Sequence, residues 1–335
     1  MNYTLLLWPH ANARYQQETR RLALAELRLM LDRTAPGAAA SIDEAAPMPC
    51  LDIACDAPLP ERALNAIRTH SLLYGLFERR ADGSLLSVEG RADALLGDDL
   101  PAILKYKGKT NELFLQLLIN VALYSGDFWD AEGPLEFMDP MCGRATAPFI
   151  ALNRGWNAVG ADVDRADLKE AERFFKRYLE YHRFKHRLTR EARTLEKGKS
   201  APVTRFELGE GVTLRLMELD AARSGEALPR NSLHLIACDL PYGVRHDAQP
   251  GQSLPKGANW LETLLARALP GWHRLLKPGG SVALSFNAQT TRRDRLRALL
   301  ADAGFDVRAE GPCDQLEHWV EQAITRDVVV GVKKG

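Results

Sequence analysis

Residues 239–243, Asp-Leu-Pro-Tyr-Gly, follow an apolar run at residues 232–238 that predicts a buried strand. An acidic residue, a proline and an aromatic ring at the carboxyl end of such a strand suit one task. The Asp239 carboxylate and the Leu240 carbonyl can accept hydrogen bonds from the amine of a planar group, while that group's face stacks on Tyr242. The proline and glycine are also what an ordinary turn after a strand contains. The segment therefore predicts either an amine-binding site or a plain turn.

A second segment lies a hundred residues upstream, where residues 139–146 read Asp-Pro-Met-Cys-Gly-Arg-Ala-Thr. Gly143 permits a tight turn into a helix, and a helix N-terminus favours a ligand carboxylate. Asp162 ends the next predicted strand, 23 residues beyond Asp139, near the ~20-residue offset at which an acidic residue meets ribose hydroxyls in Rossmann-type sites. Asp164 is the second candidate for that role. Each acid could instead cap a helix or end a solvated loop.

The elements that position these residues alternate between strands and helices. This alternation predicts an α/β fold with a Rossmann-like, doubly wound parallel sheet, in which the last two strands pair as an antiparallel hairpin. The predicted strands are 135–138, 158–162, 212–217, 233–238, 281–286, 305–309 and 327–333. The predicted helices are 112–124, 146–154, 165 to about 195, 260–276 and 290–303.

Together the two segments resemble the signatures of class I S-adenosylmethionine (SAM)-dependent methyltransferases that modify nucleobase amino groups. Leucine at position 240, in place of the commoner proline, is familiar in the tRNA guanine-N2 methyltransferases that carry a THUMP domain. The resemblance spans about residues 105–335 and implies a seven-stranded sheet with its last strand antiparallel.

The resemblance also implies roles for individual residues. Asp139, Pro140, Cys142, Gly143 and Asp162 would bind SAM, and Asp220 would face the adenine amine. Asp239, Leu240, Pro241 and Tyr242 would form the catalytic segment. Lys109, Thr110 and Asn111 match a region that closes over the cofactor, although an ordinary solvated loop fits them equally. Ala145 stands where the family pattern has its last glycine.

The first hundred residues differ from the rest. The predicted order is strand 5–8, helix 12–32, loop 34–49, strand 50–55, helix 59–73 and a hairpin at 74–78 and 85–88. This order fits a small α+β domain of ferredoxin-like type. The region carries 10 arginines, no lysine and 14 acidic residues, so it lacks the basic character of a THUMP domain, which is not recognised here. We therefore expect a domain at 1–100 and a methyltransferase domain at 101–335.

Bulk composition excludes several protein classes. The 335 residues include 44 basic and 44 acidic side chains, so a nucleic-acid partner needs a local basic surface. Five scattered cysteines form no zinc-binding spacing and indicate reduced thiols. The start resembles no signal peptide, and no apolar run is long enough for a membrane helix. The expected location is the cytoplasm, and the oligomeric state stays open.

A basic helical insertion is predicted at about residues 165–200, which carry 12 lysines and arginines against 6 acidic residues. Its interleaved aromatic residues could stack bases or form a core-facing stripe beneath a solvated basic face. His182 and His186 have a metal-like spacing on this helix, but no third ligand is evident, so no metal is expected. His234, inside a predicted strand, is interpreted as structural.

The sequence thus predicts a SAM-dependent N-methyltransferase of an exocyclic nucleobase amine, with guanine N2 in tRNA or other RNA as the leading substrate. Adenine N6 or cytosine N4 in DNA, and a protein glutamine amide, are the alternatives, because each presents a planar nitrogen. A dehydrogenase fits poorly because there is no GxGxxG segment. A scaffold with a relict fold is disfavoured by the intact Asp239, Pro241 and Tyr242.

Overall fold

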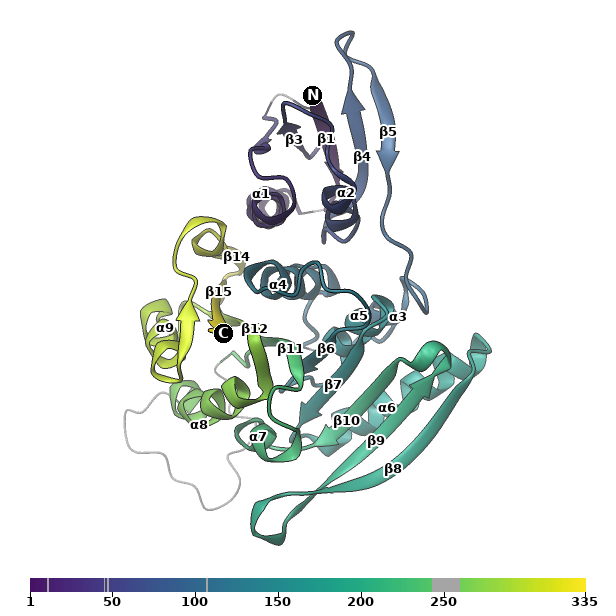
Figure 1. Ribbon diagram of the computed structural model, residues 1–335, viewed down its shortest axis with the longest axis vertical. Helices are drawn as coiled ribbons and strands as arrows, with labels where there is room; N and C mark the ends of the chain where they lie inside the picture. Colours follow the sequence, from purple (N-terminus) through teal and green to yellow (C-terminus); the bar gives the residue numbers. More distant parts are fainter. Residues whose placement is uncertain (11, 45, 47, 107, 243–259) are drawn as a thin grey trace.

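The first ninety residues form a five-stranded sheet with two helices on one face, which is the upper lobe of this computed structural model in Figure 1. The structure describes residues 1–10, 12–44, 46, 48–106, 108–242 and 260–335. The elements of this lobe are β1 (Asn2–Leu7), α1 (Ala13–Thr34), β2 (Ala39–Ile42), β3 (Cys50–Ala54), α2 (Glu61–Arg68), β4 (Leu73–Arg79) and β5 (Leu85–Glu89).

The strand order β2-β3-β1-β4-β5 is antiparallel throughout. Its first four strands have the ferredoxin-like arrangement, and β5 adds an edge. Side chains alternate along β1, so that Tyr3, Leu5 and Leu7 are buried beneath the helices. The predicted loop at 34–49 was wrong in part. The short run Ala39–Ile42 becomes a strand because it pairs with β3, a tertiary contact that overrides weak local propensity.

The second lobe contains the remaining elements. Its helices are α3 (Leu100–Ile103), α4 (Glu112–Ser125), α5 (Thr146–Asn153), α6 (Arg165–Tyr181), α7 (Ser224–Ala227), α8 (Trp260–Leu275) and α9 (Arg293–Asp302). Its strands are β6 (Glu136–Asp139), β7 (Asn157–Asp162), β8 (His186–Thr194), β9 (Ser200–Leu208), β10 (Thr213–Glu218), β11 (Leu233–Asp239), β12 (Leu276–Asn287), β13 (Phe305–Val307), β14 (His318–Glu321) and β15 (Ile324–Lys333).

Seven of these strands form the predicted Rossmann-like sheet, in the order β10-β7-β6-β11-β12-β15-β13. All pairs are parallel except those made by β15, which runs antiparallel to both neighbours. The predicted fold is therefore confirmed, including the antiparallel last strand. Helices α4, α5 and α6 share one buried cluster with one face of the sheet, and α8 and α9 share another with the opposite face.

The predicted basic helix from residue 165 to about 195 was wrong in its second half. Helix α6 ends at Tyr181, and Arg183 lies just beyond it with a φ of 59°, a left-handed conformation that stops a helix. The chain then forms the antiparallel hairpin β8–β9, which extends the sheet beside β10. Burial of the apolar side chains Val203, Phe206 and Leu208 stabilises β9. His182 and His186 therefore do not share a helix.

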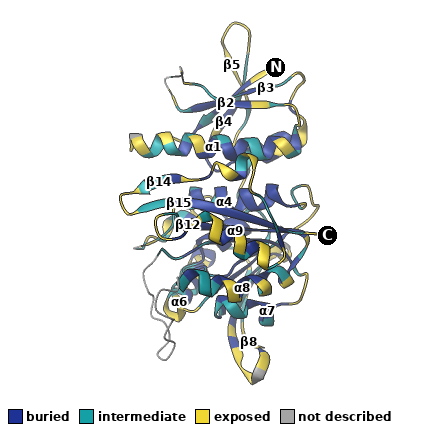
Figure 2. Cartoon of the chain, turned by 90° about the vertical axis from the view of Figure 1, so that its left-hand side faces the viewer, coloured by how far each residue is buried: buried dark blue, intermediate teal, exposed yellow. Residues whose placement is uncertain are grey.

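One apolar cluster extends across both lobes, and Figure 2 shows α1 lying between the upper sheet and α4. Met30 of α1 belongs to the same buried cluster as Leu118 and Val121 of α4. Buried Glu26 of α1 accepts hydrogen bonds from the Ser71 amide, at 2.9 Å, and from the Asn120 side chain of α4. These contacts tie the ferredoxin-like lobe to the helix that packs against the Rossmann-like sheet.

Candidate active site

A cavity of about 640 Å³ opens at the carboxyl ends of β6, β7, β10 and β11. This is where open α/β sheets bind ligands, and the volume is that of a small-molecule site. Most of the predicted site residues line it: Asp139, Pro140, Cys142, Gly143, Asp162, Asp220, Asp239 and Pro241, together with Thr110. The topology therefore brings the two sequence segments together.

The loop from Asp139 to Thr146 is shaped by two left-handed residues. Gly143 has a φ of 49°, and Ala145, at the N-cap of α5, has a φ of 66°. The left-handed conformation costs an alanine about 1–2 kcal/mol relative to the right-handed one, so the surrounding structure must hold Ala145 in it. Close packing of the next strand supports the loop, since a Cβ added to Gly160 would lie 2.8 Å from the Cys142 sulfur.

Asp139 and Asp162 end the two central strands and are clamped by backbone amides. The Met141 amide donates to Asp139 at 3.0 Å, while the Gly143 and Asp164 amides donate to Asp162 at 2.8 and 2.9 Å. Burial raises the pKa of the Asp139 carboxyl to about 7 and also raises the pKa of Asp162. A ligand group that stabilises the ionised form of either carboxyl would therefore bind favourably beside it.

Asp164 and Asp220 both cap helices. Asp164 accepts from the Ala166 and Asp167 amides at the start of α6, and Asp220 accepts from Ala222 at the start of a 3₁₀ turn. The capping interpretation therefore applies to both residues. Asp220 also lines the cavity, as does Asp164, so capping and ligand binding are compatible here.

The predicted acceptor segment begins at the end of β11, and its carboxylate is enclosed by hydrogen-bond donors. The hydroxyls of Thr110 and Tyr242 donate to the two carboxylate oxygens of Asp239, whose side chain is 10% exposed. Leu240 is buried, and its amide donates to the Ser285 carbonyl at 2.9 Å. Pro241 lines the cavity, while Tyr242 directs its hydroxyl to Asp239 and is absent from the described lining. Gly243, the last residue of the segment, lies outside the described residues.

The three predicted lid residues separate into different roles. Thr110 contacts Asp239 and lines the cavity. The Lys109 amine instead donates to the Pro101 carbonyl, at 2.6 Å, and holds α3 in place. Asn111 caps α4 by accepting from the Leu113 amide at 2.8 Å. Lys109 and Asn111 thus contact protein groups away from the cavity, and only Thr110 keeps a direct place in the site.

Arg326 is a site residue that no sequence pattern indicated. Its side chain is 6% exposed, and its Nη2 lies 3.5 Å from the Asp239 carboxylate while its Nε donates to the Tyr242 hydroxyl. The guanidinium also stacks 4.1 Å from the centre of the Phe114 ring of α4. His318, the cross-strand partner of Arg326 on β14, packs against the same ring at 5.3 Å. The β14–β15 hairpin therefore supports Asp239 and Tyr242 through Arg326, which is not among the described residues that line the cavity.

Tyr106, Arg144 and Trp260 also line the cavity and were not predicted. The Arg144 guanidinium lies 4.6 Å from the Tyr106 ring centre and pairs with Asp167 at 2.8 Å. The only sequence signal for Tyr106 was an aromatic residue within the basic stretch before α4.

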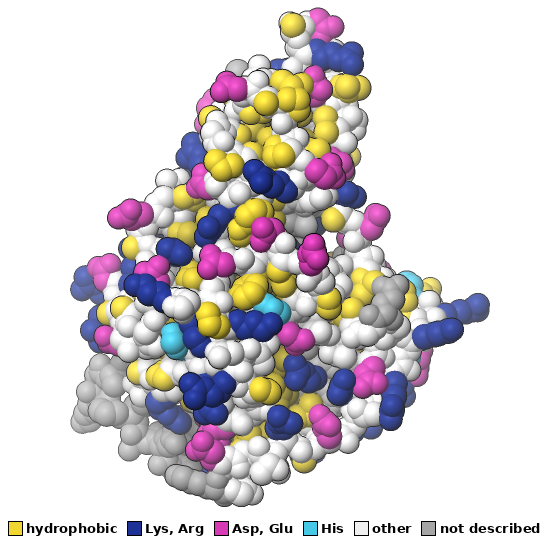
Figure 3. Space-filling view, viewed as in Figure 1, with side chains coloured by type: hydrophobic (Ala, Val, Ile, Leu, Met, Phe, Trp, Pro, Cys, Tyr) yellow, Lys and Arg dark blue, Asp and Glu magenta, His cyan; other side chains and the backbone are white. Residues whose placement is uncertain are grey.

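The charge of the cavity is strongly negative. Its described lining includes six aspartates and two arginines: Asp139, Asp162, Asp164, Asp167, Asp220, Asp239, Arg144 and Arg267. Such a lining attracts a cationic ligand and repels a pyrophosphate. The surface outside is mixed, since Figure 3 shows basic and acidic side chains interspersed over the face that it draws.

The remaining predictions concern residues away from this cavity. His234 is structural: its Nδ1 accepts from the Glu136 amide at 2.7 Å, and burial lowers its pKa to about 4. The stripe of α6 is core-facing at Phe175 and Tyr178, whereas Tyr181 is exposed. Across the described part of the chain, no group of three metal-ligating side chains is found, and no helix is long and apolar enough to cross a membrane.

No protein-family model and no curated protein sequence matches this chain. Among solved structures, TrmN from Thermus thermophilus is similar over 99% of this chain and 100% of its own, with 16% identity and a TM-score of 0.46. A methyltransferase from Pyrococcus furiosus is similar over 69% of this chain and 89% of its own, with 14% identity and a TM-score of 0.42. The magnesium protoporphyrin IX methyltransferase of Synechocystis, solved with bound SAM, is similar over 68% of this chain and 87% of its own, with 15% identity and a TM-score of 0.39. The fold assignment therefore stands on the strand order of the chain itself.

Proposed function

We propose that this protein is a SAM-dependent N-methyltransferase of an exocyclic nucleobase amine, with guanine N2 in tRNA or another RNA as its substrate. One observation carries the proposal: Asp239 and Pro241 open onto the same cavity as Asp139, Asp162 and Asp220. A group that accepts an amine therefore borders a pocket suited to a small cationic ligand.

The lining suits SAM in chemical detail. SAM carries a sulfonium and an ammonium, and both are attracted by the aspartates. Asp162 would accept from the ribose hydroxyls and Asp220 from the adenine amine, while the loop at Gly143 and the N-terminus of α5 receive the carboxylate. NAD would bring its pyrophosphate into an acidic pocket. The lining therefore supports SAM over NAD.

When bound, SAM supplies an electrophilic methyl group on sulfur. The protein's part is to bind and orient the amine. One N–H donates to Asp239 and the other to the Leu240 carbonyl, so the nitrogen lone pair is directed at the cavity. To make room, Tyr242 releases its hydrogen bond to Asp239 and its ring stacks on the base. Asp239 is then the base that takes the proton released by methylation.

The RNA assignment draws on Leu240 and on local charge. Residues 165–200 carry 12 basic against 6 acidic side chains, and they form α6, the edge strand β8 and the turn that leads into β9. Such a surface can hold a phosphate backbone. Location in the cytoplasm, where tRNA is modified, is part of the same proposal.

Calorimetry with SAM tests the cofactor half of the proposal. We expect Asp162→Ala to weaken binding by roughly 10- to 100-fold, because charge-assisted hydrogen bonds to two hydroxyls are lost, each ~1.5–3 kcal/mol before water takes their place. Asp294→Ala, which removes a highly exposed carboxylate from α9, is the matched control. No SAM binding by the wild-type protein, or equal binding by Asp162→Ala, contradicts the cofactor assignment.

Methyl transfer identifies the substrate. Tritiated SAM is incubated with bulk tRNA, DNA and protein, and the products are digested for nucleoside and amino-acid mass spectrometry. We expect N2-methylguanosine from tRNA. N6-methyladenine or N4-methylcytosine in DNA, or methylated glutamine in protein, would replace the RNA assignment and leave the acceptor chemistry in place.

A further inference from the structure

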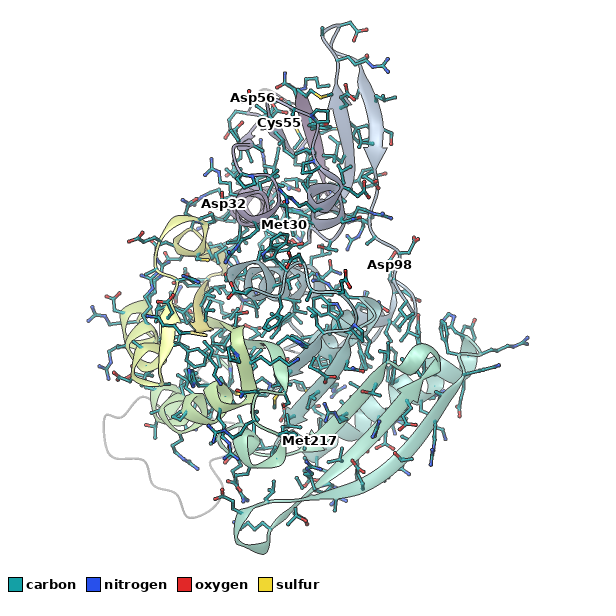
Figure 4. All side chains as sticks on the ribbon, in the orientation of Figure 1. Met30, Asp32, Cys55, Asp56, Asp98 and Met217 are labelled. Atoms are coloured by element: carbon teal, nitrogen blue, oxygen red, sulfur yellow. The ribbon has the colours of Figure 1, made fainter. Side chains whose placement is uncertain are left out.

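A second cavity of about 520 Å³ lies between the two lobes. Leu135 and Trp156, which immediately precede β6 and β7, line it, so it lies at the opposite end of the parallel strands from the aspartate-lined cavity. Residues of α2, α4 and α5 and of the segment connecting the lobes also line it. Asp98, labelled in Figure 4 on that connecting segment, is one of them.

Arginines from both lobes and the connecting segment converge on this cavity: Arg62 and Arg68 of α2, Arg91, and Arg154 at the end of α5. Arg62 donates to the Thr34 carbonyl at 2.7 Å, and Arg91 to the Gln116 amide oxygen at 2.8 Å. Arg68 lies 3.4 Å from Glu89. Each of these three therefore has a protein partner among the described residues and further N–H donors to offer.

Arg154 differs, because its guanidinium forms no hydrogen bond or ion pair with any residue that the structure describes. Its Nη1 is buried without a hydrogen-bond partner. Burial lowers the pKa of Arg154 to about 10; interactions with Tyr124 and Glu26 offset this only in part, and the charge of Arg91 adds to the lowering. Buried donors in proteins are nearly always satisfied, so an orphaned guanidinium facing a cavity calls for an anionic acceptor.

Aromatic rings form another part of the wall. Phe128, Trp129 and Trp156 line the cavity and are each half-buried, and the Arg154 guanidinium lies 5.1 Å from the centre of the Trp156 ring. Flat aromatic faces beside guanidinium groups bind a planar base joined to a phosphate. Asp93, Asp98 and Asp130 also line the cavity, and their carboxylates can accept from sugar hydroxyls.

We propose that this inter-lobe cavity binds a nucleotide, with the phosphate held by Arg154 and Arg91 and the base held against Trp129 and Trp156. The same chemistry is presented by a free mononucleotide and by an unpaired nucleotide of a single-stranded RNA. The site is independent of the methyl-transfer proposal, because it shares no lining residue with the aspartate-lined cavity among the residues that the structure describes.

Calorimetry of the full chain with guanosine monophosphate and guanosine tests this site. Saturating S-adenosylhomocysteine is present to fill the first cavity, and the titration is repeated with Asp162→Ala to show that binding persists when that cavity is impaired. We expect the monophosphate to bind at least tenfold more tightly than guanosine, which lacks the phosphate. No binding of the monophosphate, or equal binding of the two compounds, overturns the proposal.

Two variants locate the site. Arg154→Gln and Arg91→Gln are each expected to weaken monophosphate binding at least tenfold, whereas the exposed Arg292→Gln leaves it unchanged. Thermal melting checks that each variant is folded. If Arg154→Gln does not fold, the binding measured with Arg91→Gln alone tests the proposal. Unchanged binding in the folded variants overturns the proposal. A 5′-phosphorylated RNA tetranucleotide that binds more tightly than the monophosphate identifies RNA as the source, and weaker binding identifies the free nucleotide.

Discussion

The two halves of the candidate active site are held in different ways. Asp139 and Asp162 accept hydrogen bonds from the backbone amides of residues 141, 143 and 164. Each of these amides lies within four residues of Asp139 or Asp162 in the sequence. Asp239 is held by side chains instead: that of Tyr242 in its own segment, and those of Thr110 and Arg326 from distant parts of the chain. Backbone clamps fix geometry before any ligand arrives, whereas hydroxyl partners can be exchanged. Under the proposed function, Asp139 and Asp162 therefore belong to a preformed cofactor half, and Asp239 belongs to an acceptor half that the substrate opens.

The largest expected effect is that of Asp239→Ala. The amine then loses both its acceptor and the base that takes its proton, so we expect methyl transfer to fall by about a thousandfold, or ~4 kcal/mol of transition-state stabilisation. Single-turnover transfer measures this. SAM affinity should stay within a factor of about three, because the two halves are held independently.

Asp294→Ala again serves as the control, since it removes an exposed carboxylate from α9, outside the cavity lining. Unchanged transfer by Asp239→Ala would show that the amine binds elsewhere. A large loss of SAM affinity would show instead that the two halves form one cooperative unit.

Arg326→Lys tests a side chain that supports the acceptor half. Lysine keeps the charge near Asp239 but cannot contact the carboxylate and the Tyr242 hydroxyl together. We expect kcat to fall roughly 10- to 100-fold, or ~1.4–2.7 kcal/mol, with the KM for SAM unchanged. Arg292→Lys, on the exposed partner of Asp294, should change neither constant. A rise in the KM for SAM alone would assign Arg326 to the cofactor half.

The cofactor half can be tested by pH. Asp139 has a pKa of about 7 in the free protein, and a bound cation favours its ionised form. Binding of SAM below pH 7 must therefore release a proton, and the affinity should fall up to about tenfold per pH unit as the pH is lowered from 7. Calorimetry in buffers of different ionisation enthalpy measures the proton release. Asp139→Asn should flatten the profile, and a flat wild-type profile would contradict the assignment.

The same carboxyl affects stability with a defined sign. Because its pKa is raised in the fold, the unfolded chain binds fewer protons between about pH 4 and pH 7. Its contribution to the free energy of unfolding is therefore greatest at low pH and is lost as the pH rises through that window. Denaturant titrations of Asp139→Asn and of the wild-type protein should converge at low pH.

The cofactor half was the more predictable from sequence. Parallel strands place their carboxyl ends on one edge, so an acidic residue at each predicted strand end was enough to bring Asp139 and Asp162 together. Arg326 could not be found this way. It reaches Asp239 only because β15 inserts between β12 and β13, and no local pattern specifies that pairing. The hydroxyl contact of Tyr242 likewise depends on side-chain conformation, which the motif does not determine.

The β8–β9 hairpin shows a second limit of the sequence patterns. Aromatic residues at helical spacing continue up to Tyr181, and the basic residues beyond it suit a solvated helix as well as an edge strand. The decisive signal was the set of apolar residues Ala201, Val203 and Phe206, whose burial depends on tertiary contacts such as that between Phe206 and Phe175 of α6. The ferredoxin-like lobe was easier, because its order of elements alone restricts the topology.

The smallest expected effect measures how firmly the cofactor loop is preformed. Ala145 is fully buried with a φ of 66°, whereas Ala147, two residues on, is similarly buried in ordinary helix. Ala147→Gly should lower the free energy of unfolding by about 2 kcal/mol, from a lost methyl contact and a lower helix propensity. Ala145→Gly loses a similar methyl but is relieved of about 1–2 kcal/mol of left-handed strain, so it should be close to neutral. Urea denaturation of the pair gives the difference. Equal losses in the free energy of unfolding would mean that the loop carries no strain without its ligand. The contrast between a preformed cofactor half and an exchangeable acceptor half would then rest on hydrogen bonds alone.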